Sequence, residues 1–233
     1  MAYSNIFALV IGLLPSFVWL YFFIREDERH PEPKRLILYA FLAGCLSTFF
    51  VIGPQSLIQG FMPKIGFDPY SPASLFVLGA IEELFKFIAV YVVIAWRRDF
   101  DEPIDAMIYM IVAALGFAAV ENIASVFKGG DLLMGGPSQV DIASLRFVGA
   151  TLLHSLASAI VGYYWGLSLI HRAPLSRYIA EGIGVATLLH AVFNSLILIF
   201  SPESFVATLV LVAASFFILN DFEILKSYDG RES

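Results

Sequence analysis

Residues 104–127 read IDAMIYMIVAALGFAAVENIASVF. This run is long enough for one membrane-spanning helix, because the hydrocarbon core of a bilayer takes about 20 apolar residues per helix. It carries Glu121, and an ionisable side chain at membrane depth is costly and usually functional. The stretch therefore predicts a transmembrane helix that contributes a polar group to a site inside the protein.

The whole chain has the same apolar character. Of its 233 residues, 59% are hydrophobic and 15% are charged, whereas a soluble domain is about 45–50% apolar and about 25% charged. This composition argues against a disordered chain and a free cytosolic enzyme, and the net charge of −6 argues against a nucleic-acid partner. The sequence predicts an integral membrane protein in contact with the lipid bilayer.

Seven apolar stretches predict an all-α, polytopic transmembrane helical bundle of about seven spans. The short connections between them leave no room for a separate soluble domain, so residues 1–233 are expected to form one transmembrane domain. The stretches are Ile6–Ile24, Leu36–Leu57, Ser74–Ala95, Ile104–Phe127, Leu145–Ile170, Ile179–Phe200 and Phe205–Leu219.

The basic residues predict how the bundle is oriented. Most of the 14 lysines and arginines lie in alternate connections and in the C-terminal tail, and such residues favour the cytoplasmic side. We therefore expect a multi-pass protein of the plasma membrane, with the N-terminus outside and the C-terminus in the cytoplasm. On this topology the glycine-rich segment 128–144 is an outer connection, either a plain flexible one or a lid over a site.

Ionisable side chains in four of the stretches are expected at similar depths. At 1.5 Å per residue they lie about 10–15 Å below the outer face. The side chains are Glu82, Glu83 and Lys86 in the third stretch, Glu121 in the fourth, His154 in the fifth and His190 in the sixth. Their alignment predicts one water-accessible site in the outer half of the membrane.

Helical spacing suggests a role for each group. Glu82 and Glu83 are both within one turn of Lys86, whose ammonium offsets the cost of a buried carboxylate. Two such glutamates can differ in charge state, as acid–base hydrolysis requires, and the sequence leaves open which one is the base. Ser158 is one turn from His154 and is expected to orient it.

Asn194 is one turn from His190, on the same helical face. Its side chain is therefore placed to donate to a developing oxyanion.

Two classes of function use such residues. A proton- or cation-coupled transporter is the alternative to a hydrolase. Transporters usually pair discontinuous helices in two repeats, and no such pairing is visible here. The chain also lacks Gly-x-Ser-x-Gly, Gly-x-Gly-Asp and His-Glu-x-x-His motifs, which disfavours serine, aspartyl and familiar zinc-type intramembrane proteases.

The ordered polar motifs resemble those of the PrsW family of intramembrane proteases, in the superfamily of CAAX prenyl proteases and bacteriocin-processing relatives. The resemblance covers about residues 20 to 200 and includes Asp27-x-x-x-Pro31-Glu32-Pro33 and Phe41-Leu-Ala-Gly44 in the first loop and second stretch. The motifs that carry it are Glu82-Glu83-x-x-Lys86, Phe117-x-x-x-Glu121, His154 and His190-x-x-x-Asn194.

The resemblance implies an intramembrane endopeptidase that cuts a membrane-anchored protein, of the anti-sigma-factor type, near the outer membrane face. Glu82 or Glu83 would activate the attacking water with help from His154, and Lys86 would tune the glutamates. His190 and Asn194 would stabilise the oxyanion. The alternative to a metal-free glutamate–histidine mechanism is a zinc ion held by Glu121, His154 and His190.

Overall fold

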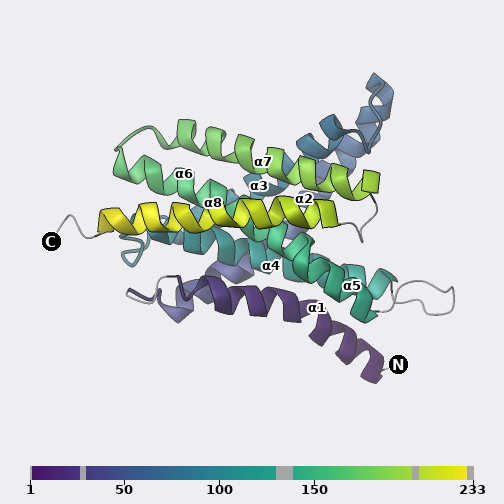
Figure 1. The fold of residues 1–233 in the computed structure, drawn as a ribbon, viewed down its shortest axis with the longest axis horizontal. Coiled ribbons are helices and arrows are strands. Elements are labelled where there is room, and N and C mark those ends of the chain that lie inside the picture. Colours follow the sequence, from purple (N-terminus) through teal and green to yellow (C-terminus); the bar gives the residue numbers. More distant parts are fainter. Residues whose placement is uncertain (1, 27–29, 130–138, 201–204, 230–233) are drawn as a thin grey trace.

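The computed structural model describes residues 2–26, 30–129, 139–200 and 205–229. In these ranges the backbone forms eight α-helices, one short 3-10 helix and no strand. The long helices run side by side in one bundle (Figure 1). In chain order the elements are α1 (Ala2–Phe23), α2 (Lys34–Phe61), η1 (Met62–Ile65), α3 (Pro72–Ile94), α4 (Pro103–Gly129), α5 (Gln139–Val148), α6 (Ala150–Ile170), α7 (Leu175–Phe200) and α8 (Phe205–Asp229).

Helix α4 forms the centre of the bundle. Of its membrane-length segment, 89% is buried inside the protein, compared with 28% for α1 and 22% for α8. Helix α4 contacts α1, α2, α3, α5, α6 and α8, so it is apolar on nearly every side because every side meets another helix. The peripheral helices instead keep large exposed apolar side chains, such as Phe216 and Phe217 of α8.

Two glycines allow α2 and α4 to cross at close distance. A Cβ on Gly44 would overlap the carbonyl oxygen of Ala113, and a Cβ on Gly116 would overlap that of Phe41. Small residues are typical of such crossings, because lipid provides no hydrophobic force between helices and close van der Waals packing must replace it. The crossing sets the position of α4 against α2, and both helices carry residues of the site described below.

Six of the seven predicted apolar stretches each coincide with one helix, and Leu145–Ile170 covers the end of α5, Gly149 and α6. Six helical segments are long and apolar enough to cross a membrane: 5–23, 34–65, 103–127, 140–170, 175–200 and 205–228. The remaining stretch is α3, whose 23 residues include Glu82, Glu83 and Lys86 and are therefore more charged than an ordinary span. The orientation of the termini stays a prediction.

Two predicted boundaries are wrong. The expected outer connection 128–144 contains the start of α5, a helix that Gly149, with φ −94° and ψ −94°, separates from α6. The choice between a flexible connection and a lid falls on residues 130–138, which lie outside the described residues. The last helix runs to Asp229 instead of ending at Leu219, because Phe222 and Leu225 remain buried beyond the polar residues Asn220 and Asp221.

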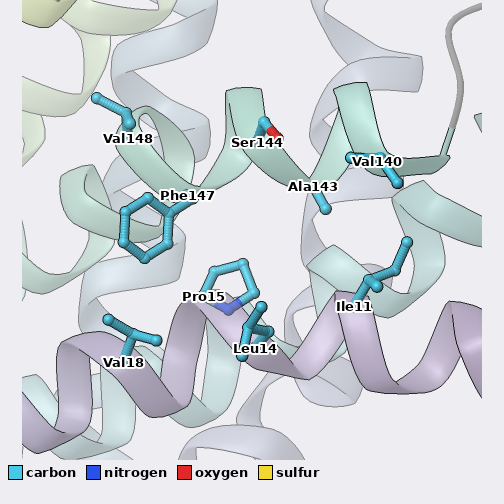
Figure 2. A pocket seen from close by; sticks show the side chains of 9 residues that line it. All are labelled: Ile11, Leu14, Pro15, Val18, Val140, Ala143, Ser144, Phe147 and Val148. Carbon is cyan, nitrogen blue, oxygen red and sulfur yellow. The ribbon is translucent and has the colours of Figure 1, made fainter.

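An apolar hollow of about 420 Å³ lies between α1 and α5. Figure 2 shows Leu14, Pro15 and Val18 of α1 on one side and Ala143 and Phe147 of α5 on the other. Among its nine lining residues, Ser144 is the polar one. This hollow is distinct from the polar cluster described next, although α5 takes part in both.

Candidate active site

Helices α3, α4, α6 and α7 bring six of the predicted site residues into one connected cluster. The cluster is joined by hydrogen bonds and ion pairs among Glu82, Glu83, Lys86, Glu121, His154 and His190. The helices come together because they pack directly against one another around α4 and α6. The predicted convergence of these polar groups is therefore present in the structure.

The innermost part of the cluster is an ion pair between Glu83 and Lys86. Lys86 Nζ lies 2.7 Å from Glu83 Oε1, and neither side chain is exposed. The Ser158 hydroxyl donates to the other carboxylate oxygen of Glu83 at 2.6 Å, and Lys86 Nζ lies 4.5 Å from the centre of the Phe117 ring. A buried ion pair is tolerated when its remaining groups are satisfied in this way.

These contacts correct two predictions. Ser158 was expected to orient His154, but it donates to Glu83. Both glutamates were expected to reach Lys86, but among the described residues Lys86 pairs with Glu83 and not with Glu82. Helical spacing places both glutamates within one turn of Lys86, and in the structure Lys86 bonds the fully buried Glu83 while Glu82 bonds Gln55.

Glu82 has a different environment. The Gln55 side-chain amide, on α2, donates to Glu82 Oε1 at 2.8 Å. The other oxygen, Oε2, is buried and has no hydrogen-bond partner among the described residues. It lies 3.8 Å from His154 Nδ1 and 3.7 Å from His190 Nε2. Glu82 thus presents an unused acceptor between two imidazole rings.

His154 bridges Lys86 of α3 to Glu121 of α4. Its Nδ1 lies 2.9 Å from Lys86 Nζ, and its Nε2 lies 2.9 Å from Glu121 Oε2. Since an ammonium can only donate, Nδ1 is the acceptor, and the ring hydrogen sits on Nε2 and is donated to Glu121. The hydrogen-bond network therefore assigns the tautomer of His154.

The His190 ring packs closely against α3 at Gly79, which has no side chain. Its ring lies edge-on to that of His154, with 5.2 Å between centroids. A Cβ added to Gly79 would lie 3.1 Å from His190 Nδ1, which is closer than ordinary packing allows. Gly79 therefore makes room for the imidazole between α3 and α7.

Asn194 is the predicted site residue that the cluster does not include. It lies one turn beyond His190 and is partly buried. Within the ranges that the structure describes, the hydrogen bonds and ion pairs that join the site do not involve it.

The geometry groups a different set of possible metal ligands from the predicted one. One ligand atom each from Glu82, His154 and His190 lie within 4.8 Å of one another, whereas the sequence had placed Glu121 with the two histidines. Glu121 instead accepts the Nε2–H of His154, the position of a carboxylate that orients a ligating histidine. One carboxylate and two imidazoles are a common zinc-binding set, and within the described ranges Glu82 Oε2 has no hydrogen-bond partner, so these residues fit a metal ion.

Several residues around the site were not singled out from the sequence. They are Gln55, which donates to Glu82, Arg146, which bonds Glu121, Asn122, which accepts from Arg146 and donates to Thr151, and Gly79, which packs against His190. Gln55 could have been found from the sequence, because it is a polar residue within the apolar stretch Leu36–Leu57.

The chain matches known proteins over most of its length. The model of the PrsW family intramembrane metalloproteases matches residues 32–219. Protease PrsW of Geobacillus kaustophilus is 30% identical over 188 residues, which cover 80% of this chain and 78% of that protein. Protease PrsW of Oceanobacillus iheyensis is 26% identical and covers 84% of this chain and 86% of that protein. The Bacillus subtilis protein of the same name is 24% identical, with coverages of 78% and 79%.

No solved structure gives a significant match. The family match nevertheless agrees with the six candidate spans, and the protein is a multi-pass membrane protein. Since the family model covers well over half of the chain and the relatives align over most of their own length, the chain belongs to the PrsW family and is an intramembrane protease.

Proposed function

We propose that the protein hydrolyses a peptide bond of a membrane-anchored protein, near the outer membrane face, with water activated by Glu82 between His154 and His190. The observation that carries this proposal is the buried, unpartnered Oε2 of Glu82, which lies 3.8 Å from one imidazole and 3.7 Å from the other. A general base needs a free acceptor within reach of its water. Glu83 has both oxygens engaged by Lys86 and Ser158 and is not proposed as the base.

In the proposed reaction, one proton moves from the attacking water to Glu82 and then to the leaving amine. Glu82 accepts a proton from the attacking water as its oxygen adds to the scissile carbonyl carbon. The tetrahedral oxyanion is stabilised by His190 and Asn194. The C–N bond then breaks, and the proton held by Glu82 passes to the leaving amine, so that one water yields one carboxyl and one amino terminus.

The remaining residues hold this arrangement in place. Lys86 donates to His154 Nδ1 and to Glu83 Oε1, which sets the His154 ring and neutralises the buried carboxylate. Glu121 accepts from the opposite ring nitrogen. The His154 ring is therefore fixed at both nitrogens and cannot turn away from Glu82.

Glu82, His154 and His190 are also the residues that would hold a zinc ion. When bound there, zinc would supply a Lewis acid and lower the pKa of a bound water. Because His154 Nε2 is taken by Glu121, the nitrogen that faces Glu82 is Nδ1, and ligation there would replace its hydrogen bond with Lys86.

The proposed substrate class is what the resemblance to the PrsW family implies, and the proposed orientation rests on the topology. We expect an anti-sigma-factor-like, single-span protein of the plasma membrane as the substrate. The basic residues of alternate connections support an orientation in which the N-terminus and the site face the outside.

Cleavage by the purified protein tests the proposal. Proteoliposomes would contain wild type or Glu82→Gln and a single-span substrate with a tag at each end, and the products would be located by mass spectrometry. The matched control is Glu181→Gln, an exposed carboxylate paired with Arg177 on α7. We expect the control to cleave like wild type and Glu82→Gln to lose activity by about 10²–10⁴-fold, the usual contribution of a general base. Full activity of Glu82→Gln would refute the role of Glu82.

A further inference from the structure

Arg146 connects α5 to the active site. Its Nη2 lies 3.1 Å from Glu121 Oε2, and its Nε donates to Asn122 Oδ1 at 2.5 Å. Glu121 Oε2 is the same oxygen that lies 2.9 Å from His154 Nε2. One carboxylate oxygen thus receives a guanidinium hydrogen and an imidazole hydrogen together.

Arg146 is held in place by its bond with Asn122 and by contacts that fix helix α5. Asn122, which accepts from Arg146, donates to the Thr151 hydroxyl at 3.0 Å and so links α4 to the first turn of α6. On the far side of α5, the Trp19 indole donates to the Phe147 carbonyl at 2.9 Å and stacks on the Phe147 ring. Because α5 is tied to α1, α4 and α6, Arg146 reaches Glu121 from a fixed position.

Glu121 needs such a partner more than Glu83 does. The Glu121 side chain is 31% exposed, whereas Glu83 is fully buried and has partners on both oxygens. Without Arg146, the described contacts of the Glu121 carboxylate would reduce to the single bond with His154, and a partly exposed carboxylate held by one bond can rotate. The His154 ring would then lose its fixed orientation at Nε2.

We propose that Arg146 is a positioning residue: it holds Glu121 so that Glu121 fixes the ring and tautomer of His154. This inference rests on the proposed function, in which Glu82 activates the water beside the His154 ring. The forked guanidinium suits the task, since its planar donors bond the Glu121 carboxylate from Nη2 and the neighbouring Asn122 amide from Nε in one rigid geometry, whereas an ammonium is a point charge on a flexible stem.

A direct role in substrate binding is the rival explanation. Arg146 also lines a hollow of about 410 Å³ between α5, the C-terminal half of α7 and the start of α8. A residue that bound substrate there would mainly change KM. A residue that positions Glu121 would mainly change kcat, because outer-shell partners of this kind typically contribute about 10–100-fold.

The kinetic test uses the proteoliposome assay with Arg146→Gln, Arg146→Lys, Glu121→Gln and the double variant Arg146→Gln/Glu121→Gln. The control is Arg177→Gln, which removes an exposed arginine from another carboxylate. We expect Arg146→Gln to lower kcat about 10–100-fold with KM within about twofold of wild type, and Arg146→Lys to recover part of the loss. The double variant should be no slower than Glu121→Gln alone, since the two residues act in series.

A second readout does not depend on turnover. The tautomer of His154 is read by NMR of ¹⁵N-histidine protein, with His154→Gln used to assign the signal. Wild type should carry its hydrogen on Nε2, and Arg146→Gln should shift the population toward the other tautomer. Inactive wild type with this tautomer shift would refute the proposed function but support the role of Arg146. An unchanged tautomer, a loss confined to KM, or additive losses in the double variant would overturn the role of Arg146.

Discussion

Glu82 and Glu83 are neighbours in the chain, yet they occupy opposite kinds of environment. Glu83 lies in what we call the closed half of the site, formed by Glu83, Lys86 and Ser158, where both of its carboxylate oxygens accept hydrogen bonds. Glu82 lies in what we call the open half, formed by Glu82, Gln55, His154 and His190. One of its oxygens accepts from Gln55, and the other lies between the two histidines with no hydrogen-bond partner among the described residues. A satisfied buried carboxylate contributes to a stable local structure, whereas an unsatisfied one is available for chemistry. The comparison therefore assigns stability to one glutamate and reactivity to the other.

The largest expected effect comes from replacing Lys86, the cation that pairs with Glu83 in the closed half. Lys86→Met leaves Glu83 as an uncompensated buried charge, so we expect the free energy of unfolding to fall by about 3–5 kcal/mol. Unfolding in mixed detergent and SDS, followed by tryptophan fluorescence, measures the change. Adding Glu83→Leu should restore most of the loss, because an apolar pair of similar volume is tolerated in place of a buried ion pair. A stable Lys86→Met variant would mean that Glu83 does not need the pair.

Zinc binding by single-residue variants tests which side chains of the open half could hold a metal ion. In protein loaded with zinc, Glu82→Gln, His154→Ala and His190→Ala should each abolish stoichiometric binding, since these three side chains converge. Glu121→Gln should keep the stoichiometry and weaken the affinity about 10–100-fold, as expected of a carboxylate that orients a ligand. Elemental analysis and competition with a chelating dye give these quantities. Loss of zinc in Glu121→Gln with retention in Glu82→Gln would restore the ligand set predicted from the sequence.

A methyl group tests how closely the open half is packed. Gly79→Ala adds a Cβ about 3.1 Å from His190 Nδ1, and overpacking of this kind costs about 1–3 kcal/mol. We expect lower stability and a several-fold lower cleavage rate because His190 must shift. The matched control is Gly184→Ala on α7, where a Cβ meets no atom within 4 Å. Equal behaviour of the two variants would show that His190 is not confined by α3.

The smallest expected effect is the stability of Glu82→Gln. Its amide oxygen still accepts from Gln55, and no ion pair with Lys86 is lost. We therefore expect the free energy of unfolding to differ from that of wild type by no more than about 1 kcal/mol, because the Gln55 hydrogen bond is kept. The unfolding assay used for Lys86→Met makes this comparison. A large destabilisation would remove the contrast between the two glutamates.

Much of this organisation is readable from sequence, for identifiable reasons. Long apolar stretches predict helices because the bilayer leaves the backbone few alternatives. Charged and imidazole side chains within these stretches predict a site because their burial is costly without a purpose. Helix α5 was missed because its ten residues are mixed in polarity. The choice of Glu83 as the partner of Lys86 was missed because helical spacing permits both glutamates.

The sequence by itself determined the class of the protein, the approximate position of seven helices and the four helices that supply the polar groups. These features depend on hydrophobicity and spacing along one chain segment at a time. Only the tertiary structure decided which oxygen stays free, that Glu121 holds His154 rather than joining the converging ligand atoms, and that Arg146 reaches the site from α5. Those outcomes depend on the rotation of each helix and on glycine-mediated approach between helices, and such relations exist only between segments distant in the chain.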